Sequence, residues 1–122
     1  MRRLMTLGFF GVALLCSGCD HGHPGNVSPS RAEMHEAKAL IAANCGACHL
    51  VPGIARAKGR VGPSLQQISR QQIIAGHFAN TPDALTRWIE HPQSMLPGDA
   101  MPETGLSHEQ VLKIVDYLYT AD

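Results

Sequence analysis

Apolar residues recur at intervals of three and four over several stretches of the chain, which is the period of an amphipathic helix. The first stretch places Ala37, Ile41 and Cys45 on one helical face. Ser30, followed three residues later by Glu33, forms a capping box, in which each side chain satisfies a backbone N–H of the other residue. We therefore predict a helix that begins directly after Ser30.

A second helix is predicted after Thr81. Threonine is a favoured N-cap, and Pro82 suits the first helical position because the N–H that proline lacks has no partner there. Leu85, Trp88 and Ile89 then share one face. The His-Pro pair that follows ends this helix.

A third helix is the strongest amphipathic run of the chain. Ser107 and Gln110 form its capping box, and its apolar positions are Val111, Leu112, Ile114, Val115, Leu118 and Tyr119. A short turn or helix is predicted near residues 64–69, and no alternating pattern typical of a strand is present. The chain is thus predicted to be all-α, with about four to five short helices joined by long loops.

The N-terminal segment is predicted to be a signal peptide over residues 1–18. Two arginines precede an apolar run over residues 4–15, which is too short for a standard spanning helix. The run ends in Cys-Ser-Gly-Cys, which resembles the lipobox of bacterial lipoproteins, although Cys16 stands where leucine is more usual. Cys19 would then be the lipidated N-terminus; the alternative is an ordinary cleaved signal.

Residues 19–30 are predicted to form a flexible tether, and residues 31–122 the folded domain. The tether is rich in Gly, Pro, Ser and Asn, and its two histidines, His21 and His23, are expected to be solvated rather than metal-bound. Removal of the signal leaves Cys19, Cys45 and Cys48, an odd number that suits one lipidated cysteine and one functional pair.

Composition excludes one class of function and points to a cofactor. The 10 basic residues balance the 10 acidic ones, so the chain lacks the clustered basic excess of a nucleic-acid-binding protein. Only 5% of the residues are aromatic, which is little for the core of a small, loop-rich domain. Domains of this kind often depend on a disulfide, a metal or another centre, and a buried prosthetic group would supply the missing apolar bulk.

Residues 45–49, Cys-Gly-Ala-Cys-His, carry the most specific chemistry. Three interpretations compete: a dithiol redox pair, part of a zinc site, or a covalent haem anchor. A zinc site needs four nitrogen or sulfur ligands, but the chain has no second pair of this kind. A thioredoxin-like dithiol expects a strand–helix–strand context, which a helical chain does not provide.

The haem interpretation fits the spacing best. Thiols at positions i and i+3 of a helical turn lie about 5–6 Å apart on one face, so Cys45 and Cys48 can each form a thioether to one haem vinyl group. His49 directly follows and can offer a nitrogen to the iron. This is the c-type attachment pattern, and we predict one covalent haem c.

The second axial ligand is predicted to be Met101. It stands in the loop Pro-Gly-Asp-Ala-Met-Pro over residues 97–102, shortly before the last helix, and the two prolines stiffen this loop. A methionine in a loop is otherwise a gap-filler. Met95 is the second choice, and the third is one of the histidines His77, His91 and His108.

Together these motifs resemble a class I cytochrome c, with residues 45–49 near the start and Met101 near the end of the domain. The resemblance covers nearly all of residues 30–121. More narrowly, the domain is similar to the haem-c domain carried by subunit II of certain terminal oxidases. That similarity rests on Ile74-Ala75-Gly76, Asn80-Thr81-Pro82, Leu85, Trp88-Ile89, Pro92-Gln93, Pro97-Gly98 and Met101-Pro102.

The resemblance implies further roles around the haem. The carbonyl of Pro63 would accept the free N–H of His49, as in the Gly-Pro pair of that family; a plain turn proline is the alternative. Trp88 and Arg70 would donate hydrogen bonds to haem propionates. Core packing explains Trp88 equally well, and a solvated surface charge explains Arg70 nearly as well. The first and last helices would cross, through Ala37 and Ile41 against Ile114, Tyr117 and Leu118.

A haem iron with both axial positions filled has no open site for a substrate, so we expect an electron carrier and not an enzyme. Methionine ligation raises the reduction potential. The expected partners are redox proteins, namely a terminal oxidase and an upstream cytochrome complex or dehydrogenase, on the periplasmic side of the inner membrane. Arg56, Lys58 and Arg60 would steer an acidic partner, or simply form a solvated loop.

Three other functions are compatible with the sequence. The chain would be a fixed subunit of an oxidase or periplasmic dehydrogenase if it copurified with a large complex. It would be a haem sensor or peroxidase if its sixth ligand were open or labile. It would be a dithiol lipoprotein if it held no covalent haem.

Overall fold

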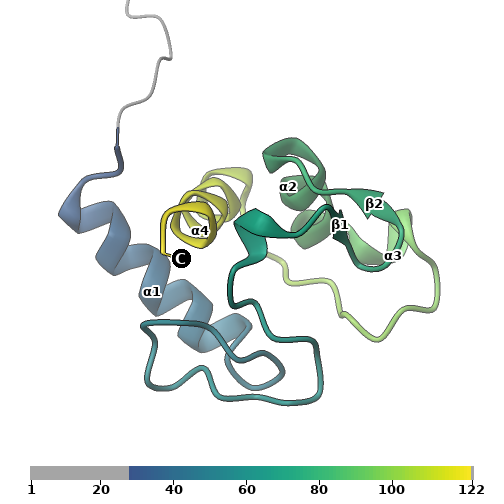
Figure 1. The fold of residues 1–122 in the computed structure, drawn as a ribbon, viewed down its shortest axis with the longest axis horizontal. Coiled ribbons are helices and arrows are strands. Elements are labelled where there is room, and N and C mark those ends of the chain that lie inside the picture. The colour runs from purple at the N-terminus through teal and green to yellow at the C-terminus, as the bar shows by residue number, and fades with distance from the viewer. Residues whose placement is uncertain (1–27, 122) are drawn as a thin grey trace, which may run out of the picture.

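The computed structural model describes residues 28–121. Four α-helices and long loops make up this part of the chain (Figure 1). The helices are α1 (Arg31–Asn44), α2 (Pro82–Glu90), α3 (Pro92–Met95) and α4 (His108–Thr120), and a 3-10 turn, η1, spans Ile68–Arg70. The predicted all-α class is confirmed.

Capping boxes start the two longest helices, as predicted. In α1 the Ser30 N–H donates to Glu33 Oε2 at 2.7 Å, and the Glu33 N–H donates to Ser30 Oγ at 3.2 Å. Ser107 and Gln110 repeat this exchange at the start of α4, at 3.0 and 3.3 Å. Each box provides acceptors for two backbone N–H groups that would otherwise lack a hydrogen-bond partner at the helix N-terminus.

The core forms where α1 and α2 pack against α4 (Figure 1). Ala37 and Ile41 on α1 are buried together with Val111, Ile114, Val115, Tyr117 and Leu118 on α4. On α2 the buried apolar residues are Ala84, Leu85, Trp88 and Ile89. Leu112 departs from the predicted apolar face, because its side chain is 42% exposed.

Three elements have no counterpart among the predictions: the short helix α3 and two strands. Strands β1 (Ile73–Ile74) and β2 (Phe78–Ala79) pair antiparallel, with Ile73 opposite Ala79 and Ile74 opposite Phe78. Two-residue strands are too short to show an alternating pattern in the sequence. The hairpin turn includes Gly76 at φ +72°, a conformation that favours glycine.

Two tyrosines on α4 hold distant loops. The hydroxyl of Tyr117 donates to the carbonyl of Pro52 at 2.8 Å, in the loop that follows the Cys-Gly-Ala-Cys-His motif. The hydroxyl of Tyr119 donates to Asn80 Oδ1 at 2.6 Å, and Asn80 Nδ2 donates to the carbonyl of Ile68 at 2.6 Å. Burial raises the pKa of both tyrosines, so at neutral pH both keep the proton that these bonds need.

Candidate haem-binding site

The Cys-Gly-Ala-Cys-His motif continues the backbone of α1 by about one turn. Cys45 is the C-cap residue of α1, and its N–H donates to the carbonyl of Ile41 at 2.9 Å. The N–H groups of Cys48 and His49 then donate to the carbonyl of Cys45 at 3.1 and 2.9 Å. Both cysteines are partly buried free thiols. The motif therefore presents two thiols and an imidazole from one ordered turn.

Burial governs the protonation of Cys45. Desolvation, with a smaller effect of neighbouring Cys48, raises the pKa of the Cys45 thiol to about 11. At neutral pH the side chain is therefore a thiol and not a thiolate.

The loop after the motif folds back onto it through backbone hydrogen bonds. The N–H of Gly62 donates to the carbonyl of Cys48 at 2.8 Å. The N–H of Gly59 lies 3.1 Å from the carbonyl of Gly46 and 3.2 Å from that of His49. These contacts fix the loop against the motif without any side chain between them.

Glycine is required at two positions of this loop because a Cβ there would overlap the backbone or the imidazole of the motif. A Cβ on Gly62 would lie 2.4 Å from His49 Cε1, inside the imidazole ring's van der Waals surface. A Cβ on Gly59 would lie 2.3 Å from the carbonyl carbon of Cys48. Sequence reasoning did not assign these steric roles. The only available signal was the glycine content of the segment.

The imidazole of His49 is oriented by one hydrogen bond. Its Nδ1 lies 2.7 Å from the carbonyl oxygen of Pro63, the contact that the resemblance to cytochromes c implied. A carbonyl only accepts, so Nδ1 must carry the proton and donate. In the neutral ring Nε2 is then unprotonated, and its lone pair is available to a metal.

Met101 lies in the loop between α3 and α4 and packs, partly buried, against the core. Its N–H donates to Asp99 Oδ1 at 2.9 Å. Met95, the second choice, is also partly buried against the core, at the end of α3. Both residues therefore pack against the apolar interior, and the choice of Met101 as axial ligand stays a prediction.

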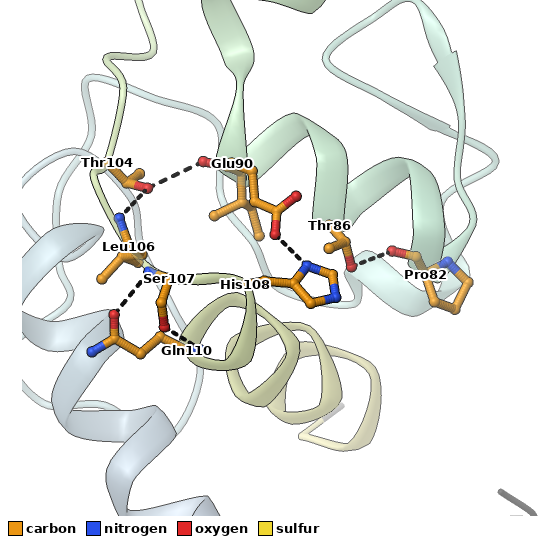
Figure 2. A network of polar contacts seen from close by, with 9 residues as sticks. Pro82, Thr86, Glu90, Thr104, Leu106, Ser107, His108 and Gln110 are labelled. Carbon is orange, nitrogen blue, oxygen red and sulfur yellow. Dashed lines mark hydrogen bonds and ion pairs between the residues drawn. The ribbon is translucent and has the colours of Figure 1, made fainter.

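The three histidines considered as axial ligands lie elsewhere. His108 Nδ1 lies 2.6 Å from Glu90 Oε1, in a contact between α4 and α2 that Figure 2 shows. His91 is 67% exposed and lies 3.9 Å from Glu103, and His77 is also exposed. These positions favour a methionine over a histidine.

Polar contacts around His108 join α2, α4 and the end of the Met101 loop (Figure 2). Thr104 Oγ1 donates to the carbonyl of Ile89 at 3.2 Å and accepts from the N–H of Leu106 at 3.4 Å. These bonds, with the Glu90–His108 contact, tie the C-terminal side of the loop to α2. Their role is structural.

Trp88 and Arg70 occupy different surroundings. Trp88 is 7% exposed, and its ring lies 5.7 Å from that of Phe78, so it is part of the core. Arg70 is exposed at the end of η1. Their roles toward haem propionates stay predictions, as does that of Cys19, which lies outside the described residues.

The donors that the chain brings together fit a covalently held haem. Cys45 and Cys48 would form the thioethers, and His49 would offer Nε2. The site suits zinc less well, because within residues 28–121 no three His, Cys, Asp or Glu side chains are grouped so that they could hold a metal ion.

Comparison with known proteins identifies the family. The family model described as cytochrome c matches residues 34–122, and the chain belongs to this family. It is 33% identical over 76 residues to cytochrome c oxidase subunit 2 of Alkalihalophilus pseudofirmus, covering 62% of this chain and 21% of the relative. It is 30% identical over 87 residues to the same subunit of Bacillus sp. strain PS3, covering 68% and 24%.

The match spans about a fifth to a quarter of the length of these relatives. Membership of the family nevertheless settles the cofactor: one covalently bound haem c, with Cys45 and Cys48 in the expected attachment region. When bound, the haem iron gains and loses one electron, so the protein has a haem electron-transfer role.

We expect Gly62→Ala to disturb the imidazole of His49, because the new methyl group overlaps the ring. The variant should lose about 1–3 kcal/mol of stability, as overpacked sites do, and a smaller share of its chains should carry covalent haem. Denaturant unfolding and the ratio of haem absorbance to protein measure both effects.

Gly76→Ala is the matched control for that variant. A Cβ at Gly76 meets nothing within 4 Å, so the substitution adds only the strain of a positive φ. Equal haem content in Gly62→Ala and the unmodified protein would contradict the proposed fit.

Proposed function

We propose that the protein is a membrane-tethered monohaem cytochrome c that passes single electrons to a terminal oxidase. Cys45 and Cys48 anchor the haem, and His49 and Met101 are its axial ligands. The observation that carries this proposal is the 2.7 Å contact between His49 Nδ1 and the Pro63 carbonyl, because it frees Nε2 for the iron.

Each residue has a definite task in such a carrier. The Pro63 carbonyl holds the proton of His49 on Nδ1 and makes Nε2 a stronger donor. Gly59 and Gly62 let the loop close on the motif, which brings the Pro63 carbonyl to His49. The thioether of Met101 favours ferrous over ferric iron and so raises the potential. With both axial positions filled, no site remains for a substrate.

The charge distribution supports an acidic redox partner. Residues 37–82 contain five basic residues and no acidic one, whereas residues 83–122 contain seven acidic and two basic ones. All five basic residues of the first segment are exposed and form no salt bridge within residues 28–121: Lys38, Arg56, Lys58, Arg60 and Arg70. Lys113, in the second segment, pairs with Glu36 and Glu109 at 3.0 and 3.1 Å. The basic segment contains the haem motif and can steer an acidic surface toward it.

A membrane tether at Cys19 would keep the carrier close to its partners. Among residues 28–121 no helix has the length and apolar character needed to cross a bilayer. A lipid on Cys19, followed by the tether of residues 19–30, would place the domain on the periplasmic side of the bacterial inner membrane. Tethering raises the effective concentration near membrane partners without new contacts.

A second candidate is a fixed haem-bearing subunit of an oxidase complex. The relatives are named as oxidase subunits, and the chain matches only part of their length. Copurification with a large complex under mild detergent would favour the fixed subunit, and recovery as a separate protein would favour the carrier.

Met101→Ala tests the axial ligand. The weak red band of sulfur-ligated ferric haem should disappear, and the potential should fall by on the order of 0.1 V, within the roughly 0.8 V range that axial ligands span. The reduced variant should also bind carbon monoxide, which the unmodified protein should exclude. Met95→Ala, which keeps the predicted ligand, is the control. An unchanged spectrum and potential in Met101→Ala would disprove the assignment.

Arg60→Glu tests steering by the basic segment. The rate of electron transfer to the oxidase should fall by between about two- and tenfold at low salt, and this difference should shrink as salt rises. Arg31→Glu makes the same charge change at an exposed position on α1 and should have a smaller effect. Equal slowing in both variants would show that only net charge matters.

Cys19→Ala tests the anchor. Cells fed labelled palmitate should label the unmodified protein, and the variant should lose the label and leave the membrane fraction, since one lipid carries the whole attachment. Cys16→Ala removes a cysteine from the signal segment and should keep the label. Label retained by Cys19→Ala would rule out lipidation at this residue.

A further inference from the structure

Gln93 makes three side-chain hydrogen bonds to the loop that carries Met101. Its Oε1 accepts from the N–H of Gly98 at 3.1 Å. Its Nε2 donates to the carbonyl of Asp99 at 2.8 Å and to the carbonyl of Met101 at 2.7 Å. The side-chain amide of this partly buried residue therefore uses its acceptor and both donors on three loop residues, Gly98, Asp99 and Met101.

These bonds fix the backbone of Met101 from both sides. Its carbonyl accepts from Gln93, and its N–H donates to Asp99 Oδ1 at 2.9 Å. The direction of a side chain follows from the orientation of the two peptide groups beside it. With both peptide groups held, the Cα–Cβ bond of Met101 has a fixed direction, which limits the positions that its sulfur can reach.

The loop has little else to hold it on its N-terminal side. Gly98 adopts φ +85°, and a Cβ there would meet nothing within 4 Å, so the turn is open to solvent. The backbone bond in this turn runs from the N–H of Asp99 to the carbonyl of Leu96 at 3.2 Å. Gln93 thus connects an exposed turn to α3, whose first residue, Pro92, is buried.

We propose that Gln93 is a positioning residue that holds Met101 at the haem iron. The proposal rests on the axial role of Met101 proposed above. Gln93 itself does not need to touch the haem. By holding the loop, it lowers the chance that the thioether leaves the iron, which matters most for ferric iron because a soft sulfur binds it less tightly.

The affinity of a competing ligand measures how firmly Met101 is held at the iron. Imidazole binds the ferric iron only when Met101 leaves, so its apparent affinity reports how firmly the loop holds the sulfur. We expect Gln93→Leu, which keeps the bulk and removes all three bonds, to raise imidazole affinity about tenfold. That factor corresponds to about 1.4 kcal/mol, the scale of one or two hydrogen bonds. The red band should weaken in parallel.

Gln93→Glu is the second variant, in case the leucine disturbs folding. It keeps the size and an acceptor for Gly98 but places a carboxylate against two carbonyl oxygens. Its imidazole affinity should rise at least as much as in Gln93→Leu. Two controls accompany it: Gln72→Ala removes an exposed glutamine outside the loop, and Thr81→Ala removes the N-cap of α2 and so lowers stability generally.

The outcomes separate this proposal from the assignment of Met101. Imidazole affinities of both Gln93 variants within about twofold of the unmodified protein, or a rise of the same size in Thr81→Ala, would overturn the positioning role. If Met101→Ala loses the red band while the Gln93 variants behave like the unmodified protein, only the role of Gln93 fails. A red band retained in Met101→Ala would overturn both.

Discussion

The hydrogen bond from His49 Nδ1 to the Pro63 carbonyl is the contact on which the rest of the site depends. It selects one tautomer of the imidazole and so decides which nitrogen can face a metal. It forms only because the loop returns to the motif at backbone distance, with glycine at residues 59 and 62. The bond therefore depends on two residues that have no chemical function of their own.

The helices serve mainly to hold the two loops in place. α1 delivers the motif, and α4 packs against α1 and α2. Tyr117 holds the carbonyl of Pro52 in the loop after the motif, and Tyr119 reaches Asn80 beyond the hairpin. One helix thus fixes segments from both parts of the chain that flank the site. The two tyrosines of this domain therefore hold loops in position through their hydroxyl groups, in addition to filling space in the core.

The sequence was sufficient to predict those parts of the fold and the site whose signals lie within a few neighbouring residues. Capping boxes at Ser30 and Ser107, the proline after Thr81, and the attachment motif each lie within a few residues, and the predicted class and cofactor are confirmed. It was insufficient where contacts join distant or irregular segments. The close approach at Gly59, the two-residue strands and the three bonds of Gln93 depend on loop geometry that no periodicity encodes.

The two sides of the site are held by unequal means. On the His49 side, several backbone bonds, two sterically required glycines and the Pro63 carbonyl act together, so the loss of one leaves others. On the Met101 side, Gln93 supplies most of the bonds to the turn. An electron carrier needs its ligands to stay in place when the iron changes charge. If Met101 is the axial ligand, as proposed, the weaker and softer ligand lies on the side where most of the bonds to the loop come from a single side chain.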